Sequence, residues 1–190
     1  MTETQVEILT HAVPWLVTIG ASATAVVYDL RGRRIPNRLT FPLLAGGLIW
    51  AGVVHGLGGA GIALLAALLM MSPFVLLWLI GGAGAGDAKL IGAIAAWLGF
   101  PDAVVAVLGV ALAGGVLAGG YLLARRSFAE TGRNFRGIGL GLMCLVFARG
   151  SWQTRRAMLP GVQVQASMPY AVAILAGTVA AGGWTWLVQG

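Results

Sequence analysis

Two aspartates, Asp29 and Asp87, are the residues of this sequence best suited to chemistry. Each lies at the end of an apolar segment, and a carboxylate inside a membrane is costly, by about 2.5–3.5 kcal/mol on insertion scales. Two carboxylates that share a site titrate as a coupled pair, so that one keeps a proton while the other is a base. Such a pair can activate a water and polarise a peptide carbonyl, as aspartic proteolysis requires. Either aspartate alone could equally be a helix cap or a loop residue in water.

Other catalytic arrangements have less support. The single cysteine, Cys144, cannot form an internal disulfide or a four-cysteine zinc site, and His11 and His55 are both expected on the face opposite to the aspartates. Neither a GxSxG nor an HExxH motif occurs in the sequence. We therefore expect no metal and no organic cofactor.

The sequence next to each aspartate suggests how it is positioned. Gly84 and Gly86 remove side chains just before Asp87, which would let an extended substrate strand approach the backbone. The alternative is a simple glycine turn with an aspartate cap. Lys89 is either an anchor at the membrane interface, which we favour, or a charge that tunes the carboxylates.

The composition indicates a membrane protein. Hydrophobic residues make up 58% of the 190 residues and charged residues only 9%, against about 25% charged in average soluble domains, and mean hydropathy is +0.88. These values exclude an ordinary cytosolic domain, a disordered chain and a nucleic-acid binder. The many glycines, as in the stretch 113–124, indicate helices that pack closely in lipid.

We predict an all-α polytopic protein with one transmembrane domain over residues 1–190 and about six spans. The spans are expected near 10–29, 40–56, 60–81, 88–100, 103–124 and 168–188, of which 88–100 is short for a bilayer. The segment 135–148 is apolar but too short and glycine-rich for a span, and it is expected to be interfacial or re-entrant. The other acidic residues, Glu3, Glu7, Asp102 and Glu130, are expected in termini or loops.

The basic residues predict the orientation. All twelve lysines and arginines fall after the first span, at the start of the fourth, or in the long loop 125–167. With six alternating spans these regions share one face, which the positive-inside rule makes cytoplasmic. Both termini are then outside, both aspartates lie at the cytoplasmic face, and the net charge of +6 is a topology signal.

The ordered motifs resemble the type IV prepilin peptidases, which are intramembrane aspartic proteases of the GxGD type. The matching residues are Asp29, Ile35, Pro36, Asn37, Leu39 and Thr40, then Gly84, Gly86, Asp87, Lys89 and Leu90, and finally Pro169 and Tyr170 at the start of the last span. The resemblance covers roughly residues 15–125 and 168–180. It implies that Asp29 and Asp87 are catalytic and that the other residues support them.

The same resemblance implies a function. It predicts cleavage of the basic leader peptide from prepilins or pseudopilins at the cytoplasmic face of the bacterial inner membrane. The sequence begins directly at the first span and lacks the paired CxxC motifs of long members, so we expect a peptidase without N-methyltransferase activity, similar to the short enzymes of Flp/Tad-type pili. The alternatives are a proton-coupled transporter or a catalytically idle scaffold of a secretion machine. The sequence leaves the oligomeric state open.

Overall fold

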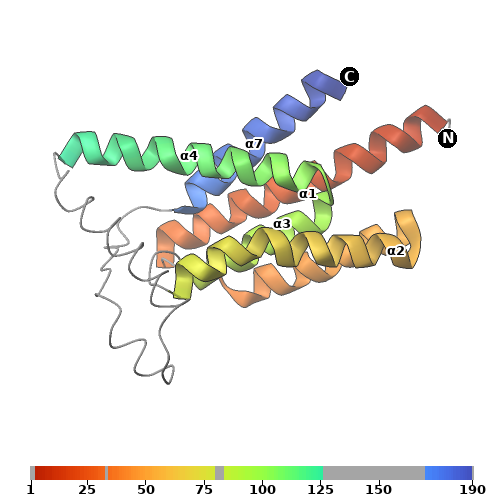
Figure 1. The fold of residues 1–190 in the computed structure, drawn as a ribbon, viewed down its shortest axis with the longest axis horizontal. Coiled ribbons are helices and arrows are strands. Elements are labelled where there is room, and N and C mark those ends of the chain that lie inside the picture. Colours follow the sequence, from red (N-terminus) through yellow and green to blue (C-terminus); the bar gives the residue numbers. More distant parts are fainter. Residues whose placement is uncertain (1–2, 33, 80–83, 126–169, 190) are drawn as a thin grey trace, which may run out of the picture.

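The computed structural model describes residues 3–32, 34–79, 84–125 and 170–189, and the regular structure in these ranges is entirely α-helical. The five helices are α1 (Glu3–Gly32), α2 (Asn37–Leu79), α3 (Ala85–Leu98), α4 (Asp102–Arg125) and α7 (Tyr170–Gln189). They form one elongated bundle with their axes roughly along its length (Figure 1). The predicted all-α class is therefore confirmed for the described ranges.

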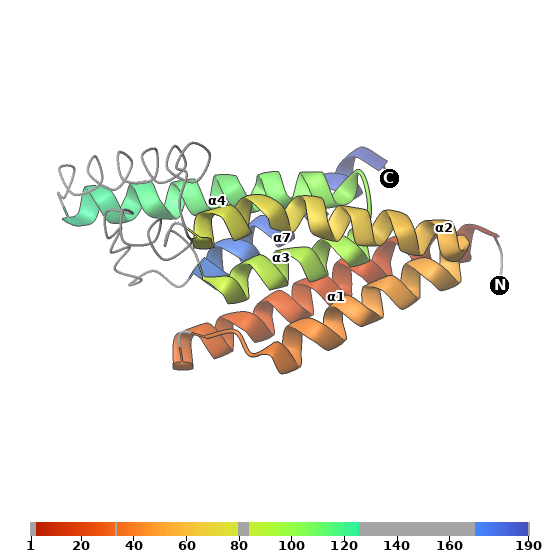
Figure 2. The ribbon, with the colours of Figure 1, turned by 60° about the horizontal axis from the view of Figure 1, so that its bottom comes forward.

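The second helix doubles back on itself. Gly56 has a φ of 70° and a ψ of −171°, which breaks the helical path and which glycine adopts without a steric penalty. Two arms therefore run away from Gly56 and diverge, and α3 packs against both of them (Figure 2). These arms correspond to the segments 40–56 and 60–81 that the sequence separated.

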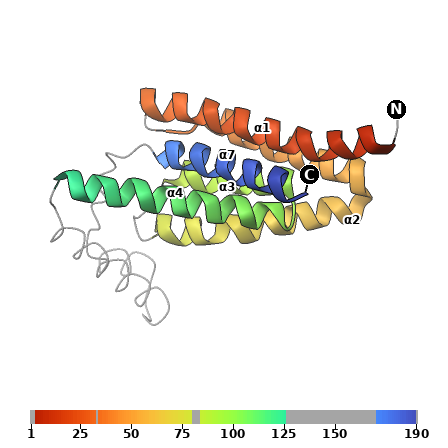
Figure 3. The ribbon, with the colours of Figure 1, turned by 90° about the horizontal axis from the view of Figure 1, so that it is seen from above.

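The shortest helix, α3, is the centre of the bundle. Every residue from Leu90 to Ala96 is buried. Its side chains join a core with Phe74 of α2, Val110 of α4 and Ile174 of α7. The other helices lie around it (Figures 2 and 3). From Leu90 to Leu98 the helix carries only apolar side chains, so it can be surrounded by other helices without burying a charge.

The surrounding helices expose apolar side chains instead of burying them. Leu57, Val53 and Leu187 are among the large hydrophobic residues left mostly exposed, at 93%, 78% and 83%. Four helices, α1, α2, α4 and α7, are long and apolar enough to cross a membrane. Exposed apolar surface on this scale is expected when lipid is the solvent. The structure thus supports a polytopic helical membrane protein, and the count of six spans remains a prediction.

Some acidic residues lie elsewhere than expected. Glu3 and Glu7 belong to α1, because that helix begins at Glu3, before the predicted span. Asp102, expected in a loop, lies in the first turn of α4 and is only 8% exposed. An aspartate is favoured in the first turn because its charge complements the helix dipole. Glu130, the segment 135–148 and nearly all of the loop 125–167 lie outside the described residues.

Candidate active site

Three helix ends meet at the same end of the bundle. The last turns of α1 carry Asp29, the first turn of α3 carries Asp87, and α7 begins with Tyr170. This end lies opposite the start of α1 and the end of α7 (Figure 3). The structure therefore brings the two predicted catalytic aspartates, which are far apart in the sequence, to one end of the fold.

Asp87 is held against the glycines that precede it. Gly84 is the N-cap residue of α3, with φ −82° and ψ 138°, and the Asp87 amide donates a hydrogen bond to the Gly84 carbonyl at 3.2 Å. The side chain folds back so closely that a methyl group added at Gly84 would lie 2.7 Å from Asp87 Oδ2. A side chain at residue 84 would therefore displace the Asp87 carboxylate, and the approach of a substrate strand at this glycine remains a prediction.

Burial changes the acidity of Asp87, which lies outside the four helices long enough to span a membrane. The pKa of its carboxyl is raised to about 6, first because burial disfavours the charged form and second because the negative charge of Asp29 repels it. A hydrogen bond with the Gly84 backbone opposes the rise in pKa. The negative charge of Asp29 therefore acts on the carboxyl of Asp87, as the predicted pairing of the two residues requires.

Asp29 contacts the start of α7. The amide of Ala171 donates a hydrogen bond to Asp29 Oδ2 at 3.4 Å. The first amides of a helix have no acceptor within the helix, and the helix dipole favours negative charge near them. The side chain of Asp29 in α1 thus contacts α7, which follows the long loop 125–167 in the sequence.

The two predicted motifs are in direct contact. A methyl group added at Gly86 would lie 3.0 Å from Ile35 Cβ, so this glycine lets α3 pack against the segment before α2. Pro36 immediately precedes α2, and its carbonyl accepts a hydrogen bond from the Leu39 amide at 3.0 Å. Leu39 itself packs against the core cluster.

Lys89 links the same two elements. Its Nζ donates a hydrogen bond to Asn37 Oδ1 at 2.9 Å and lies 5.4 Å from the ring centroid of Phe41. A cation at this distance from an aromatic face is attracted to it. Lys89 therefore joins α3 to the start of α2, a contact that neither of the two alternatives considered for this lysine included.

The ring of Tyr170 packs against α2 and α4, and the sequence did not predict these contacts. Its ring meets Phe74 of α2 edge-on, with centroids 6.2 Å apart and an interplanar angle of 61°, and it lies over Gly114 of α4. Gly114 belongs to a stretch assigned only to general helix packing, and nothing in the sequence distinguished it from Gly115. Pro169, the other predicted residue of this element, lies outside the described residues.

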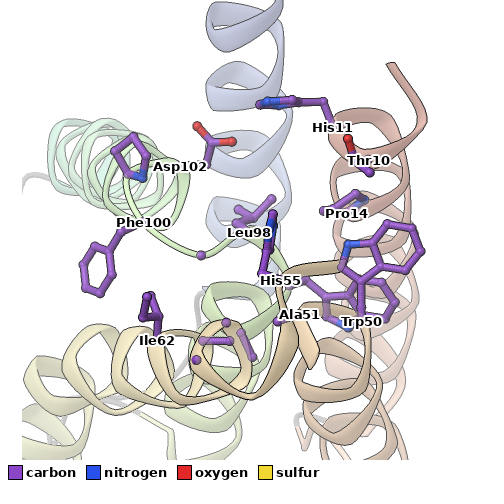
Figure 4. Close-up of a pocket in the computed structure, with 17 residues that line it drawn as sticks. Thr10, His11, Pro14, Trp50, Ala51, His55, Ile62, Leu98, Phe100 and Asp102 are labelled. Carbon is purple, nitrogen blue, oxygen red and sulfur yellow. The ribbon is translucent and has the colours of Figure 1, made fainter. Parts of the chain in front are cut away.

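A large cavity lies at the other end of the bundle. It measures about 790 Å³ and is lined by α1, the turn of α2, the end of α3 and the start of α4. His11, His55 and Asp102 line it together with Trp50 and Phe100 (Figure 4). Neither Asp29 nor Asp87 borders it. Among the described residues, no group of three or more His, Cys, Asp or Glu is placed to hold a metal ion.

Comparison with known proteins identifies the family. The profile of the type IV leader peptidase family matches residues 16–119, more than half of the chain. A prepilin leader peptidase/N-methyltransferase of Aeromonas hydrophila is 37% identical over 107 residues, which cover 51% of this chain and 36% of the relative. Proteins of the same description from Aeromonas salmonicida (strain A449) and Burkholderia pseudomallei (strain 1026b) are also 37% identical, over 51% and 45% of this chain and 35% and 30% of their own lengths.

The chain thus spans about a third of the length of the curated relatives it matches. No solved structure matches it significantly. The matched region contains both aspartates and both motifs that surround them, so the resemblance drawn from those residues is confirmed. The chain belongs to the type IV leader peptidase family.

Proposed function

We propose that this protein is an intramembrane aspartic endopeptidase that removes the basic leader peptide of prepilins or pseudopilins, with Flp-type prepilins as the first candidates. One observation carries the proposal. Asp29 and Asp87 reach the same end of the bundle from different helices, and the charge of one raises the pKa of the other. The family match supports leader peptides as the substrate class.

The proposed reaction needs only the two carboxyls and a water. The ionised carboxylate takes a proton from the water as its oxygen attacks the scissile carbonyl, and the protonated carboxyl donates its proton to the carbonyl oxygen. The tetrahedral intermediate then collapses: the C–N bond breaks, the leaving nitrogen receives the proton held by the pair, and one hydroxyl of the intermediate returns a proton to the pair as the new carboxyl group forms. Burial keeps a proton on Asp87 up to a pH of about 6, which favours Asp87 as the acid and Asp29 as the base.

The cytoplasmic face is proposed for this end of the bundle. Arg31 lies in the last turn of α1, Arg34 in the connection to α2, and Arg38 in the first turn of α2. Lys89 lies two residues after Asp87. A concentration of basic residues beside the ends of apolar helices is typical of the cytoplasmic side. Because the enzyme is itself basic here, the basic leader is recognised through helix packing and contacts at the cut site, not through simple charge attraction.

A cleavage assay in membranes tests the proposal. Co-expression with an Flp-type prepilin, followed by gel shift and mass spectrometry, should show leader removal by the parent chain. Asp29→Asn and Asp87→Asn should each abolish it. Asp102→Asn is the matched control, because Asp102 is also a buried aspartate but lies at the opposite end of the bundle.

The outcomes separate the alternatives. Cleavage that survives Asp29→Asn or Asp87→Asn would disprove the shared-proton mechanism. An inserted protein that cleaves no prepilin would favour the idle scaffold, and proton movement that needs both aspartates would favour a transporter. We also propose that the protein lacks N-methyltransferase activity, since Cys144 is the single cysteine of the sequence and paired CxxC motifs need four. Mass spectrometry of the new pilin terminus should then find it unmethylated.

A further inference from the structure

The side chain of Tyr170 is fixed by two other helices. Phe74 meets the ring edge-on from α2, and Gly114 of α4 provides the space on its other side. A methyl group added at Gly114 would lie 3.3 Å from both Cε2 and Oη of Tyr170. A side chain at residue 114 would therefore force the ring or the helix to shift by a few tenths of an ångström.

The backbone that follows this ring contacts one catalytic aspartate. Tyr170 is the first residue of α7, and the next residue, Ala171, is fully buried. Ala171 donates its amide hydrogen to Asp29 Oδ2. Because Ala171 directly follows Tyr170, a shift of the start of α7 that accommodates the ring would displace this donor as well.

The hydroxyl group of Tyr170 interacts with the other aspartate, Asp87. The phenol of Tyr170 and the carboxylate of Asp87 interact electrostatically, so the two groups lie near each other. One residue thus connects the two carboxyls, through its own phenol on one side and through the neighbouring amide on the other.

We infer that Tyr170 and Gly114 are positioning residues: Gly114 seats the Tyr170 ring, and the seated ring holds the start of α7 where it orients Asp29 against Asp87. This inference rests on the proposed two-aspartate peptidase. It assigns a role in the reaction to a glycine of α4 that touches neither aspartate. A misplacement of about 1 Å in a catalytic group can lower a rate by about 100-fold.

A matched pair of glycine variants tests the inference. Gly114→Ala places a methyl group against Tyr170, whereas Gly115→Ala places one in open space, in the same helix and at the neighbouring position. We expect Gly114→Ala to lower kcat for prepilin cleavage by about 10- to 100-fold with a smaller change in KM, and Gly115→Ala to leave both near the parent values.

Tyr170→Phe supplies the second measurement. This substitution keeps the ring against Phe74 and Gly114 and removes only the hydroxyl near Asp87. We expect the alkaline limb of the pH profile of kcat/KM to shift. Thermal unfolding in detergent should stay unchanged. If Gly114→Ala does not fold, this pH profile decides the question alone. Equal activity of the two alanine variants, or an unchanged pH profile for Tyr170→Phe, would overturn the inference. A parent protein without cleavage activity would instead overturn the proposed function.

Discussion

Gly84 offers a way to move a catalytic carboxylate without disturbing the fold. A methyl group added there would lie 2.7 Å from Asp87 Oδ2, whereas ordinary contacts begin near 3.4 Å, so the oxygen must retreat by about 0.7 Å. The backbone itself accepts a side chain, because the φ of −82° and ψ of 138° at Gly84 are open to any residue. Only the flexible end of Asp87 has to move, which makes the change cheap in stability.

The effect on catalysis should be much larger than the effect on stability. Displacing a catalytic group by about 1 Å can cost about 100-fold in rate, so we expect Gly84→Ala to lower kcat/KM for prepilin cleavage by about 10- to 100-fold. This loss corresponds to about 1.4–2.7 kcal/mol of transition-state stabilisation. The assay is leader cleavage in detergent or membranes over a range of prepilin concentrations, with thermal unfolding measured in parallel.

Gly84→Ser separates the steric effect from a capping effect. Gly84 is the N-cap of α3 and makes no side-chain cap hydrogen bond, and serine caps a helix better than glycine by a few tenths of a kcal/mol. Serine should therefore hold or raise the unfolding temperature but still lower activity, because it also carries the added carbon. If serine restores activity while alanine does not, the loss comes from the helix start and not from displacement of Asp87, and our reasoning is wrong.

Four further predictions concern the Asp87 carboxyl, Lys89 and the packing of α7 against α4. Cleavage should decline as the pH rises through about 6, because the pair then loses the proton that burial retains on Asp87, and a profile unchanged from pH 5 to 8 would contradict this. The same raised pKa implies that Asp87 contributes stability below pH 3.8 that is lost as pH rises to about 6, and unfolding of Asp87→Asn should lack this dependence. Lys89→Met, which removes the bond to Asn37, should lower stability by about 1 kcal/mol, and a double-mutant cycle with Asn37→Ala should give less than the sum of the two single effects. Gly177→Ala should destabilise the protein by about 1–3 kcal/mol, because the methyl group would collide with the Val110 backbone of α4, whereas Gly183→Ala, with open space around it, should not.

The sequence predicted the membrane character and the two aspartates because both depend on local properties. Hydropathy along the chain marks apolar segments without reference to the fold, and a carboxylate at the end of such a segment stands out because it is costly there. The same local reading located the turn of α2 between its two arms, since glycines interrupt the apolar run at that point. The family resemblance followed from motifs that are contiguous in the sequence.

The tertiary structure decided which helix lies at the centre and which glycine has which neighbour. Lipid and protein core are both apolar, so hydropathy does not distinguish a helix that faces lipid from one that is buried, and α3 could not be recognised as the central helix. Gly114 and Gly115 are identical in the sequence, yet one lies against Tyr170 and the other faces open space. The hydrogen bonds of Lys89 to Asn37 and of Ala171 to Asp29 likewise exist only because helices far apart in the chain end at the same place.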